Sequence, residues 1–304
     1  MPVRSPRLAP ALLMLATLTA AACSSATPAA DPHAGHAMEG MTTASVLVPS
    51  DPTLPAASTD VADRLARSPR HGEYAMIRTG PSDSVRAWIV YPERATNAPV
   101  VVVVHEIFGL STWIRGVADQ LAADGYIAIA PDLLTGKAVP APGSDTLTQA
   151  VATATIRTLD AGTVQRQLAA VGAYGMALPA AQHRYGVVGF CWGGGTSFAH
   201  AVASPSGLGA AVVYYGTSPA LPSLASVRAP VLGLYAGDDA RVDATVPPAD
   251  SAMRALGKSF EPHTFAGAGH GFLRQQDGKG GANLAATRQA WPLTLAFFRA
   301  HLGR

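Results

Sequence analysis

A short glycine-rich turn constrains this chain more than any other feature. The sequence GFCWG at 189–193 follows the apolar run at 185–188, and its central residue is Cys191. A strand that ends in Gly-x-nucleophile-x-Gly and turns at once into a helix is a nucleophile elbow. Small neighbours let the chain fold back tightly, so the central side chain stands clear at the carboxyl edge of a sheet. The pattern predicts a nucleophile on a strand-to-helix turn, with cysteine where serine is usual.

Apolar runs and segments of helical periodicity alternate from about residue 72 onward. The run at 99–105 contains five consecutive valines, which is typical of a strand buried on both faces. Strands are expected at 74–78, 85–91 (an antiparallel pair), 99–105, 126–130, 185–188, 208–215, 231–235 and 260–265, and helices at 113–122, 159–178 and 283–302. This alternation predicts an α/β fold, a mostly parallel, doubly wound sheet flanked by helices, in one domain at 72–304.

The N-terminal residues have the pattern of an export signal. In residues 1–23, two arginines precede the apolar run at 12–18, and three alanines lead into Cys23. Basic, apolar and small segments in that order predict a secretory signal peptide, and the apolar run is too short to span a bilayer. Cys23 also resembles the lipidated first residue of a mature bacterial lipoprotein, with ordinary signal cleavage as the alternative. Either alternative predicts an exported protein of the bacterial cell envelope.

Residues 24–71 are rich in Ala, Pro, Ser, Thr and Asp and lack periodicity, so we expect a flexible tether. Four of its side chains could capture copper, because imidazole and thioether are suitable ligands. They are His33, His36, Met38 and Met41. An incidental polar linker is the alternative, since spacing in a disordered segment defines no geometry. No metal or cofactor is expected in the folded domain.

Composition limits the classes of function. The net charge is only +2, and no Lys/Arg-rich block could follow a phosphate backbone, so nucleic-acid binding is not expected. The chain is 48% hydrophobic and 14% charged, which provides ample material for a core. Its two cysteines, Cys23 and Cys191, form no disulfide framework. We therefore expect small-molecule chemistry at Cys191, with membrane contact only through a lipid anchor.

A cysteine nucleophile needs a base, and the base needs an acid to orient it. In a doubly wound sheet both partners lie on loops after later strands, in the order nucleophile, acid, histidine. His270 lies between glycines after the last predicted strand, and Asp238 and Asp239 follow the run at 231–235. We choose Asp239 as the acid, because the apolar Val242 three residues on would anchor its loop. Asp238 remains the alternative and is expected to cap the turn.

The loop HEIFG at 105–109 directly follows the valine run. In α/β-hydrolases this loop supplies the second backbone N–H of the oxyanion hole, here from Ile107, while Trp192 after the nucleophile supplies the first. An acidic residue in this loop is unusual, because its charge opposes a developing oxyanion. Glu106 therefore needs a cationic partner or a role in handling a proton.

Together these motifs resemble the dienelactone hydrolase family of α/β-hydrolases. GFCWGG around Cys191, HEIFG around Glu106, Asp239 and GHGF around His270 occur in the order of that family over residues 72–304. The resemblance implies a Cys191–His270–Asp239 triad in which Glu106 accepts the thiol proton when substrate binds. It implies a carboxylic ester hydrolase that opens an ester or lactone through a thioacyl enzyme.

The same resemblance implies substrate-binding residues. Arg274 lies four residues after His270, where the arginine of the family pairs with Glu106 and with a substrate carboxylate. The YYG sequence at 214–216 matches a family pattern in which one tyrosine lines the pocket, which we assign to Tyr214. We assign Phe108 to the same pocket.

Two departures leave the substrate open. The second carboxylate-binding arginine of the family is missing, and the region after Pro131-Asp132 offers only Lys137 as a cation before Arg157. Export also differs from a soluble catabolic enzyme. The alternatives are an exported carboxylesterase or small peptidase of broader range, and a non-catalytic surface module that handles metal through its His/Met segment.

Overall fold

The structure is a computed structural model that describes residues 51–93, 97–137 and 143–303. The predicted signal peptide, the lipidation site at Cys23 and the four candidate copper ligands lie outside the described residues. Their assignments therefore remain predictions.

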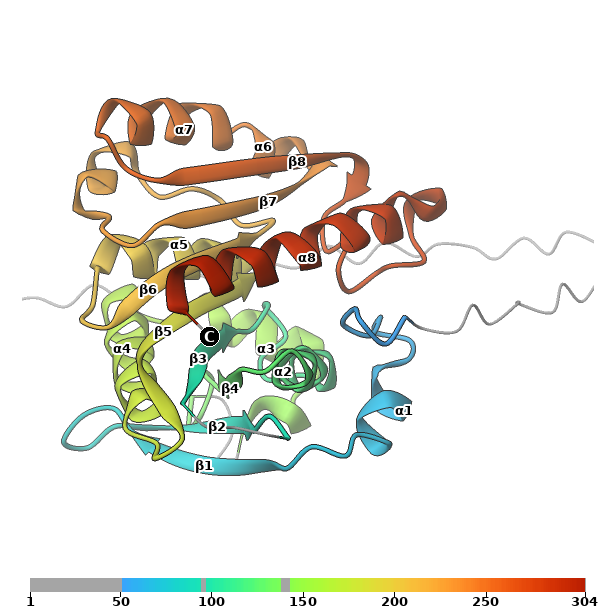
Figure 1. Cartoon of the computed structure of the whole chain (residues 1–304), viewed down its shortest axis with the longest axis vertical. Coiled ribbons are helices and arrows are strands. Elements are labelled where there is room, and N and C mark those ends of the chain that lie inside the picture. The colour runs from blue at the N-terminus through green and yellow to red at the C-terminus, as the bar shows by residue number, and fades with distance from the viewer. Residues whose placement is uncertain (1–50, 94–96, 138–142, 304) are drawn as a thin grey trace, which may run out of the picture. The chain divides into compact units, whose positions relative to one another are not determined.

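A single eight-stranded sheet forms the centre of the described domain, in the order β1-β2-β4-β3-β5-β6-β7-β8 (Figure 1). The strands are β1 Gly72–Arg78, β2 Ser84–Val90, β3 Ala98–Val104, β4 Ile127–Pro131, β5 Ala181–Phe190, β6 Leu208–Tyr214, β7 Val231–Asp238 and β8 Phe260–Gly269. β2 runs antiparallel to both β1 and β4, and every other pair in the sheet is parallel. The predicted mostly parallel α/β sheet is confirmed.

Helices cover both faces of this sheet (Figure 1). They are α1 Val61–Ala66, α2 Thr112–Ala123, α3 Gln149–Ile156, α4 Ala161–Met176, α5 Trp192–Ala203, α6 Ala240–Asp243, α7 Val246–Ala255 and α8 Ala282–Leu302, with short 3-10 turns at Ser144–Thr146, Leu221–Ser226 and Lys279–Gly281. One apolar cluster joins α2 and α8 to the sheet, and the other joins α4, α5 and α7 to the opposite face.

The valine run in β3 explains why both faces are covered. All seven residues of β3 are buried. Successive side chains of a strand point to opposite faces, so Val101 and Val103 join the α2/α8 cluster while Val100 and Val102 join the other. A strand that is apolar at every position can remain in water only between two layers of helices.

The folded domain includes residues 51–71, so the predicted tether is wrong for that segment. Leu54 and Val61 are buried against α2, and the indole Nε1 of Trp113 donates to the carbonyl of Ala56 at 3.1 Å. A Cβ at Gly116 of α2 would lie 2.2 Å from Val61 Cγ2, which shows how closely the segment packs. Composition alone does not reveal that a few apolar residues of this segment pack against a helix that lies far along the chain.

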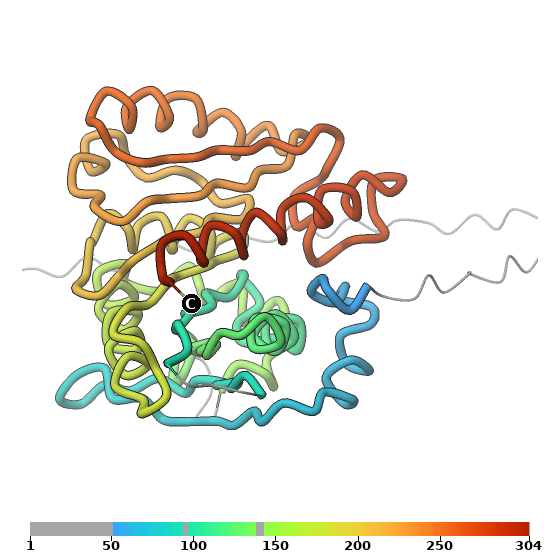
Figure 2. Tube along the Cα trace, viewed as in Figure 1, coloured from blue at the N-terminus to red at the C-terminus, as the bar shows by residue number. Residues whose placement is uncertain are grey.

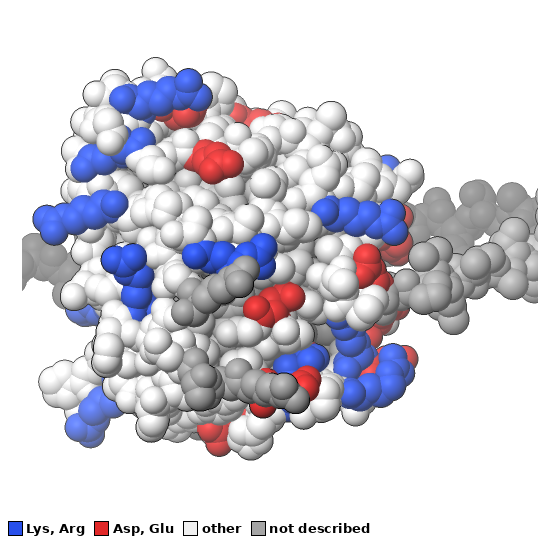
Figure 3. Space-filling model, in the orientation of Figure 1, with Lys and Arg blue, Asp and Glu red and all other residues white. Residues whose placement is uncertain are grey.

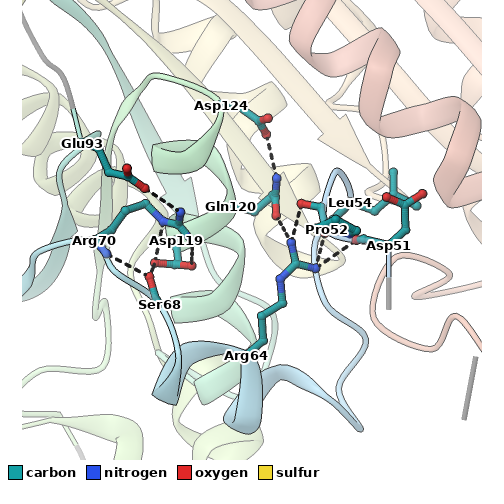
Figure 4. A network of polar contacts seen from close by, with 10 residues as sticks. All are labelled: Asp51, Pro52, Leu54, Arg64, Ser68, Arg70, Glu93, Asp119, Gln120 and Asp124. Atoms are coloured by element: carbon teal, nitrogen blue, oxygen red, sulfur yellow. Dashed lines mark hydrogen bonds and ion pairs between the residues drawn. The ribbon is translucent and has the colours of Figure 1, made fainter. Parts of the chain in front are cut away.

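Polar contacts also hold this segment against α2 (Figure 4). Arg64 donates to the carbonyls of Pro52 at 2.7 Å and Leu54 at 2.6 Å, and it contacts the Gln120 side chain. Arg70 forms a two-point ion pair with Asp119 at 3.0 and 2.6 Å. We call residues 51–66 the N-terminal strap.

The strap also runs beside the loop that precedes α8 (Figure 2). The N–H of Ser58 donates to the carbonyl of Arg274 at 2.9 Å. The amide of Gln276 donates to the carbonyl of Pro55 at 2.8 Å. The start of the described chain is therefore attached to a loop near its end.

Surface charge and helix length add two observations. On the face drawn in Figure 3, basic and acidic side chains of the described chain are interspersed and form no continuous basic area. Within the described ranges, no helix combines the length and apolarity required to cross a bilayer.

Candidate active site

Cys191 occupies the predicted elbow between β5 and α5. Its φ of 57° lies in the left-handed region that a non-glycine residue rarely adopts. A Cβ at Gly189 would lie 1.9 Å from the carbonyl of Gly193, and a Cβ at Gly193 would lie 2.4 Å from the carbonyls of Val104 and His105. Glycine at these two positions lets strand and helix approach closely enough to present the strained cysteine.

The thiol of Cys191 is a weak acid in this site. Burial, followed by the negative charge of Glu106, raises the pKa of the Cys191 thiol above its ordinary value. The backbone N–H of Trp192 and the charge of Arg241 act in the opposite direction on that pKa. The raised pKa favours the protonated thiol, and Glu106 is close enough to influence that pKa.

His270 and Asp239 meet at the same edge of the sheet. His270 follows β8 and Asp239 follows β7, and His270 Nδ1 lies 2.5 Å from Asp239 Oδ2. Asp238 points away and forms an exposed ion pair with Lys279. Val242 is fully buried, as expected for an anchor beneath this loop. Of the two candidate acids, Asp239 contacts the histidine.

Glu106 and Arg274 form a buried ion pair. Glu106 Oε2 lies 3.0 Å from Arg274 Nε, although the angle at this contact does not satisfy a hydrogen bond. Burial raises the pKa of Glu106 to about 7, and Arg274 opposes that rise. The guanidinium also lies over the ring of Phe108, 5.2 Å from its centroid. Arg274, from the segment after His270, thus contacts two residues of the HEIFG loop.

Tyr214 does not face this site, so its assignment to the pocket is wrong. It is the last residue of β6 and points to the α8 face, where its hydroxyl bonds to Thr294 Oγ1 at 2.7 Å. Tyr215 lies just beyond the strand with a φ of 39°, and its ring centroid is 5.1 Å from that of His270. Its buried hydroxyl has no hydrogen-bond partner within the part of the chain that the structure describes. The end of the strand, which sequence did not locate exactly, decides which tyrosine reaches the site.

His105 was part of a predicted motif but had no predicted role. It is fully buried, with Nδ1 2.7 Å from the carbonyl oxygen of Glu106. Its Nε2 lies 3.2 Å from the backbone N of Leu133. Its ring stacks on the indole of Trp192, with centroids 5.6 Å apart. Only the folded structure shows that this histidine contacts both segments that carry the predicted oxyanion hole, the 105–109 loop and the start of α5.

Two pockets flank these residues. One of about 270 Å³ lies beside the elbow and is lined in part by Leu159, Val164, Trp192 and Pro219. The other, of about 290 Å³, lies beside Arg274 and Phe108 and is lined in part by Ser58, Val61 and Ser144. Lys137, the cation considered for the missing arginine, lines a different pocket with Thr163 and Gln167. Within the described residues, no three His, Cys, Asp or Glu side chains gather as a metal site.

Comparison with known proteins agrees with the motifs and the geometry. The model of the dienelactone hydrolase family matches residues 85–302. A relative from Salmonella typhi, provisionally named a carboxymethylenebutenolidase, is 32% identical over 264 residues, which cover 82% of this chain and 96% of the relative. A relative of the same name from Escherichia coli K12 is 30% identical over 82% of this chain and 95% of its own length.

The fold matches solved structures as well. A crystal structure from Klebsiella pneumoniae, provisionally described as a dienelactone hydrolase, covers 75% of this chain and 98% of its own chain. It has 28% sequence identity and a TM-score of 0.65. Shared motifs, the extent of the family match and the shared fold lead to one conclusion. The chain belongs to the dienelactone hydrolase family of the α/β-hydrolase superfamily.

Proposed function

We propose that this hydrolase opens small esters or lactones through a thioacyl intermediate on Cys191. The observation that carries the proposal is the strained elbow that presents Cys191, with a buried carboxylate, Glu106, close enough for its charge to act on the thiol. Burial raises the pKa of Glu106 to about 7. A base is most useful when its pKa lies near the working pH. The His270–Asp239 contact supplies the second acid–base group that a two-step hydrolysis requires.

Acylation begins with transfer of the Cys191 thiol proton to Glu106. The thiolate attacks the carbonyl carbon, and the N–H groups of Trp192 and Ile107 stabilise the oxyanion of the tetrahedral intermediate. The C–O bond of the ester then breaks, and the leaving oxygen takes the proton that Glu106 has just received. The products of this step are the thioacyl enzyme and an alcohol, which for a lactone remains attached to the acyl group.

Deacylation uses the histidine. His270, oriented by Asp239, takes a proton from a water molecule, and the resulting hydroxide attacks the thioester carbonyl. The new tetrahedral intermediate expels the Cys191 thiolate, which recovers its proton from His270. The acid product leaves, and the resting thiol is restored.

The pockets and the relatives support small esters or lactones as substrates. Each of the two flanking pockets has a volume just below 300 Å³, which is slightly smaller than the usual range for small-molecule sites and favours small substrates. The relatives carry the name of an enzyme that opens a butenolide lactone. Thiolates attack activated esters more readily than amides, which argues against the small-peptidase alternative.

Turnover of p-nitrophenyl acetate by the wild type, abolished in Cys191→Ala, tests the mechanism. Turnover that survives in Cys191→Ala would overturn it. A panel of esters and lactones with and without a carboxylate, assayed on the wild type and Arg274→Ala, then tests the substrate class. A preference for carboxylates that disappears in Arg274→Ala indicates dienelactone-like substrates, whereas equal rates indicate a general esterase.

Export and lipid anchoring at Cys23 are a separate part of the proposal. The support is the order of basic, apolar and small residues before that cysteine. We expect the full-length chain to partition into the detergent phase of a bacterial extract, and Cys23→Ser to remain in the aqueous phase. Equal partitioning of the two chains would refute the lipid anchor without affecting the catalytic proposal.

A further inference from the structure

His105 is held in a single protonation pattern by its two ring contacts. The backbone N–H of Leu133 can only donate, so Nε2 of His105 accepts that hydrogen bond. The carbonyl of Glu106 can only accept, so Nδ1 carries the proton and donates to it at 2.7 Å. Complete burial lowers the pKa of His105, which agrees with a neutral ring. The imidazole therefore acts as a fixed bridge between two backbone segments.

The contact with the Glu106 carbonyl orients a neighbouring N–H group. The C=O of Glu106 and the N–H of Ile107 belong to the same peptide group. In a planar trans peptide these two bonds point in opposite directions. A hydrogen bond that holds the carbonyl on the His105 side therefore directs the Ile107 N–H away from His105.

The same ring also packs against the other half of the predicted hole. His105 stacks on the indole of Trp192, with an angle of 22° between the ring planes. Trp192 is the first residue of α5, and its backbone N–H influences the Cys191 thiol. The side chains of Trp192 and Ile107 both pack on a small cluster formed by Leu134, Ala152 and Ile156. His105 thus contacts Trp192 directly, and it bonds to the peptide group that carries the Ile107 N–H.

We propose that His105 is a positioning residue that sets the geometry of both oxyanion-hole N–H groups. It acts through the Glu106 carbonyl on one side and through the Trp192 ring on the other. The inference rests on the proposed thioacyl mechanism, in which those N–H groups stabilise a developing negative charge. An N–H that is misaligned affects the transition state more than the bound substrate, so the expected effect is on kcat rather than on KM.

Two substitutions separate the two ring contacts of His105. In His105→Asn, the side-chain NH2 can occupy the place of Nδ1 and donate to the Glu106 carbonyl. In His105→Gln, the longer amide reaches the place of Nε2 but leaves that carbonyl without its donor. Neither amide can stack on Trp192 as the imidazole does, so both variants lose that contact. We expect His105→Asn to lose about threefold in kcat for p-nitrophenyl acetate. His105→Gln, which also lacks the donor to the Glu106 carbonyl, should lose about 10- to 100-fold in kcat, with little change in KM in either variant.

Alkylation of Cys191 by iodoacetamide is the control, because it requires the thiol but forms no oxyanion. We expect equal alkylation rates and similar melting temperatures in the wild type and both variants. The inference is overturned if His105→Gln retains wild-type kcat, or if His105→Asn loses as much kcat as His105→Gln. Turnover that survives in Cys191→Ala would instead overturn the proposed mechanism itself.

A measurement on the wild type tests the inference without any substitution. Nitrogen-15 NMR of histidine-labelled protein distinguishes a ring protonated at Nδ1 from one protonated at Nε2. We expect His105 to be neutral and protonated at Nδ1. A proton on Nε2 would remove the donor to the Glu106 carbonyl and overturn the inference even if a variant failed to fold.

Discussion

At the scale of single residues, burial acts in the same direction on the pKa values of Glu106 and Cys191. Burial disfavours the charged form of both side chains, and it is the first cause of the raised pKa of each. Arg274 lies 3.0 Å from Glu106 and favours the carboxylate, so Glu106 is the more readily charged of the two at neutral pH. A bound substrate that attracts the guanidinium would weaken that pairing and make Glu106 a stronger base toward the thiol.

Activity is expected to rise with pH through a midpoint near 7. Below this pH, Glu106 is protonated and cannot accept the thiol proton, and above it the carboxylate is available. The pH profile of kcat/KM for p-nitrophenyl acetate measures the midpoint. Glu106→Gln should lower kcat/KM by about 10²- to 10⁴-fold and remove the rise at this midpoint. The same midpoint at full activity in Glu106→Gln would contradict the role of the carboxylate.

The two neighbouring aspartates provide a matched pair of variants. Asp239 contacts His270 at 2.5 Å, whereas Asp238 forms an exposed ion pair with Lys279. We expect Asp239→Asn to lower kcat by about 10²- to 10⁴-fold, because the imidazole loses its orienting acceptor. Asp238→Asn should leave kcat within about twofold, since exposed ion pairs contribute little. Equal losses in the two variants would refute Asp239 as the orienting acid.

At the scale of elements, the site collects loops from the ends of parallel strands. β3 leads to Glu106, β5 to Cys191, β7 to Asp239 and β8 to His270. Parallel strands end at the same edge of a sheet, so these four loops meet there, as expected for an open α/β fold. The N-terminal strap is the exception, because it reaches this edge from outside the residues that the family match covers.

The strap is expected to fix the backbone of Arg274. The Ser58 N–H donates to the Arg274 carbonyl at 2.9 Å, and Ser58 lines the pocket beside the arginine. Ser58→Pro removes this donor, while Ser58→Ala keeps it. We expect Ser58→Pro to lower kcat/KM for a carboxylate-bearing ester about 3- to 10-fold more than Ser58→Ala does. This difference corresponds to the loss of one hydrogen bond worth about 1 kcal/mol. Equal kcat/KM values for the two variants would show that the Ser58 N–H does not fix the backbone of Arg274.

At the scale of the whole described domain, two apolar clusters on opposite faces of one sheet provide the core. The strap belongs to the cluster under α2 and α8, to which it contributes Leu54, Ala56 and Val61. The folding unit therefore includes residues that composition assigned to a tether. Packing against α2 makes residues 51–66 part of that unit.

Deletion of the strap is expected to destabilise this unit. Burial of Leu54 and Val61 is worth about 1.5–3 kcal/mol each, so a chain that begins at residue 72 should lose about 3–6 kcal/mol in its free energy of unfolding. A chain that begins at residue 48 should unfold like the full-length protein. Urea unfolding at pH 7 measures the difference. Equal stability of the two shortened chains would show that the strap adds nothing to the folding unit.

Local signals in the sequence determined much of this molecule by themselves. The valine run predicts a strand covered on both faces, and the glycines around Cys191 predict the elbow. The order of motifs predicts Asp239 and His270 on later loops. These features could be inferred because each depends on residues close together in the chain or on the direction shared by parallel strands.

Tertiary structure decided the features that depend on distant residues. The end of β6 and the packing of α8 place Tyr214 in the core and Tyr215 at the site. Packing against α2 holds the strap, and the Leu133 loop fixes the ring of His105. No local pattern encodes these contacts, because each partner lies tens of residues away and is brought near only by the sheet. The sequence by itself thus determined which groups can react. Only the folded chain decided which neighbours fix the positions of those groups and shift their pKa values.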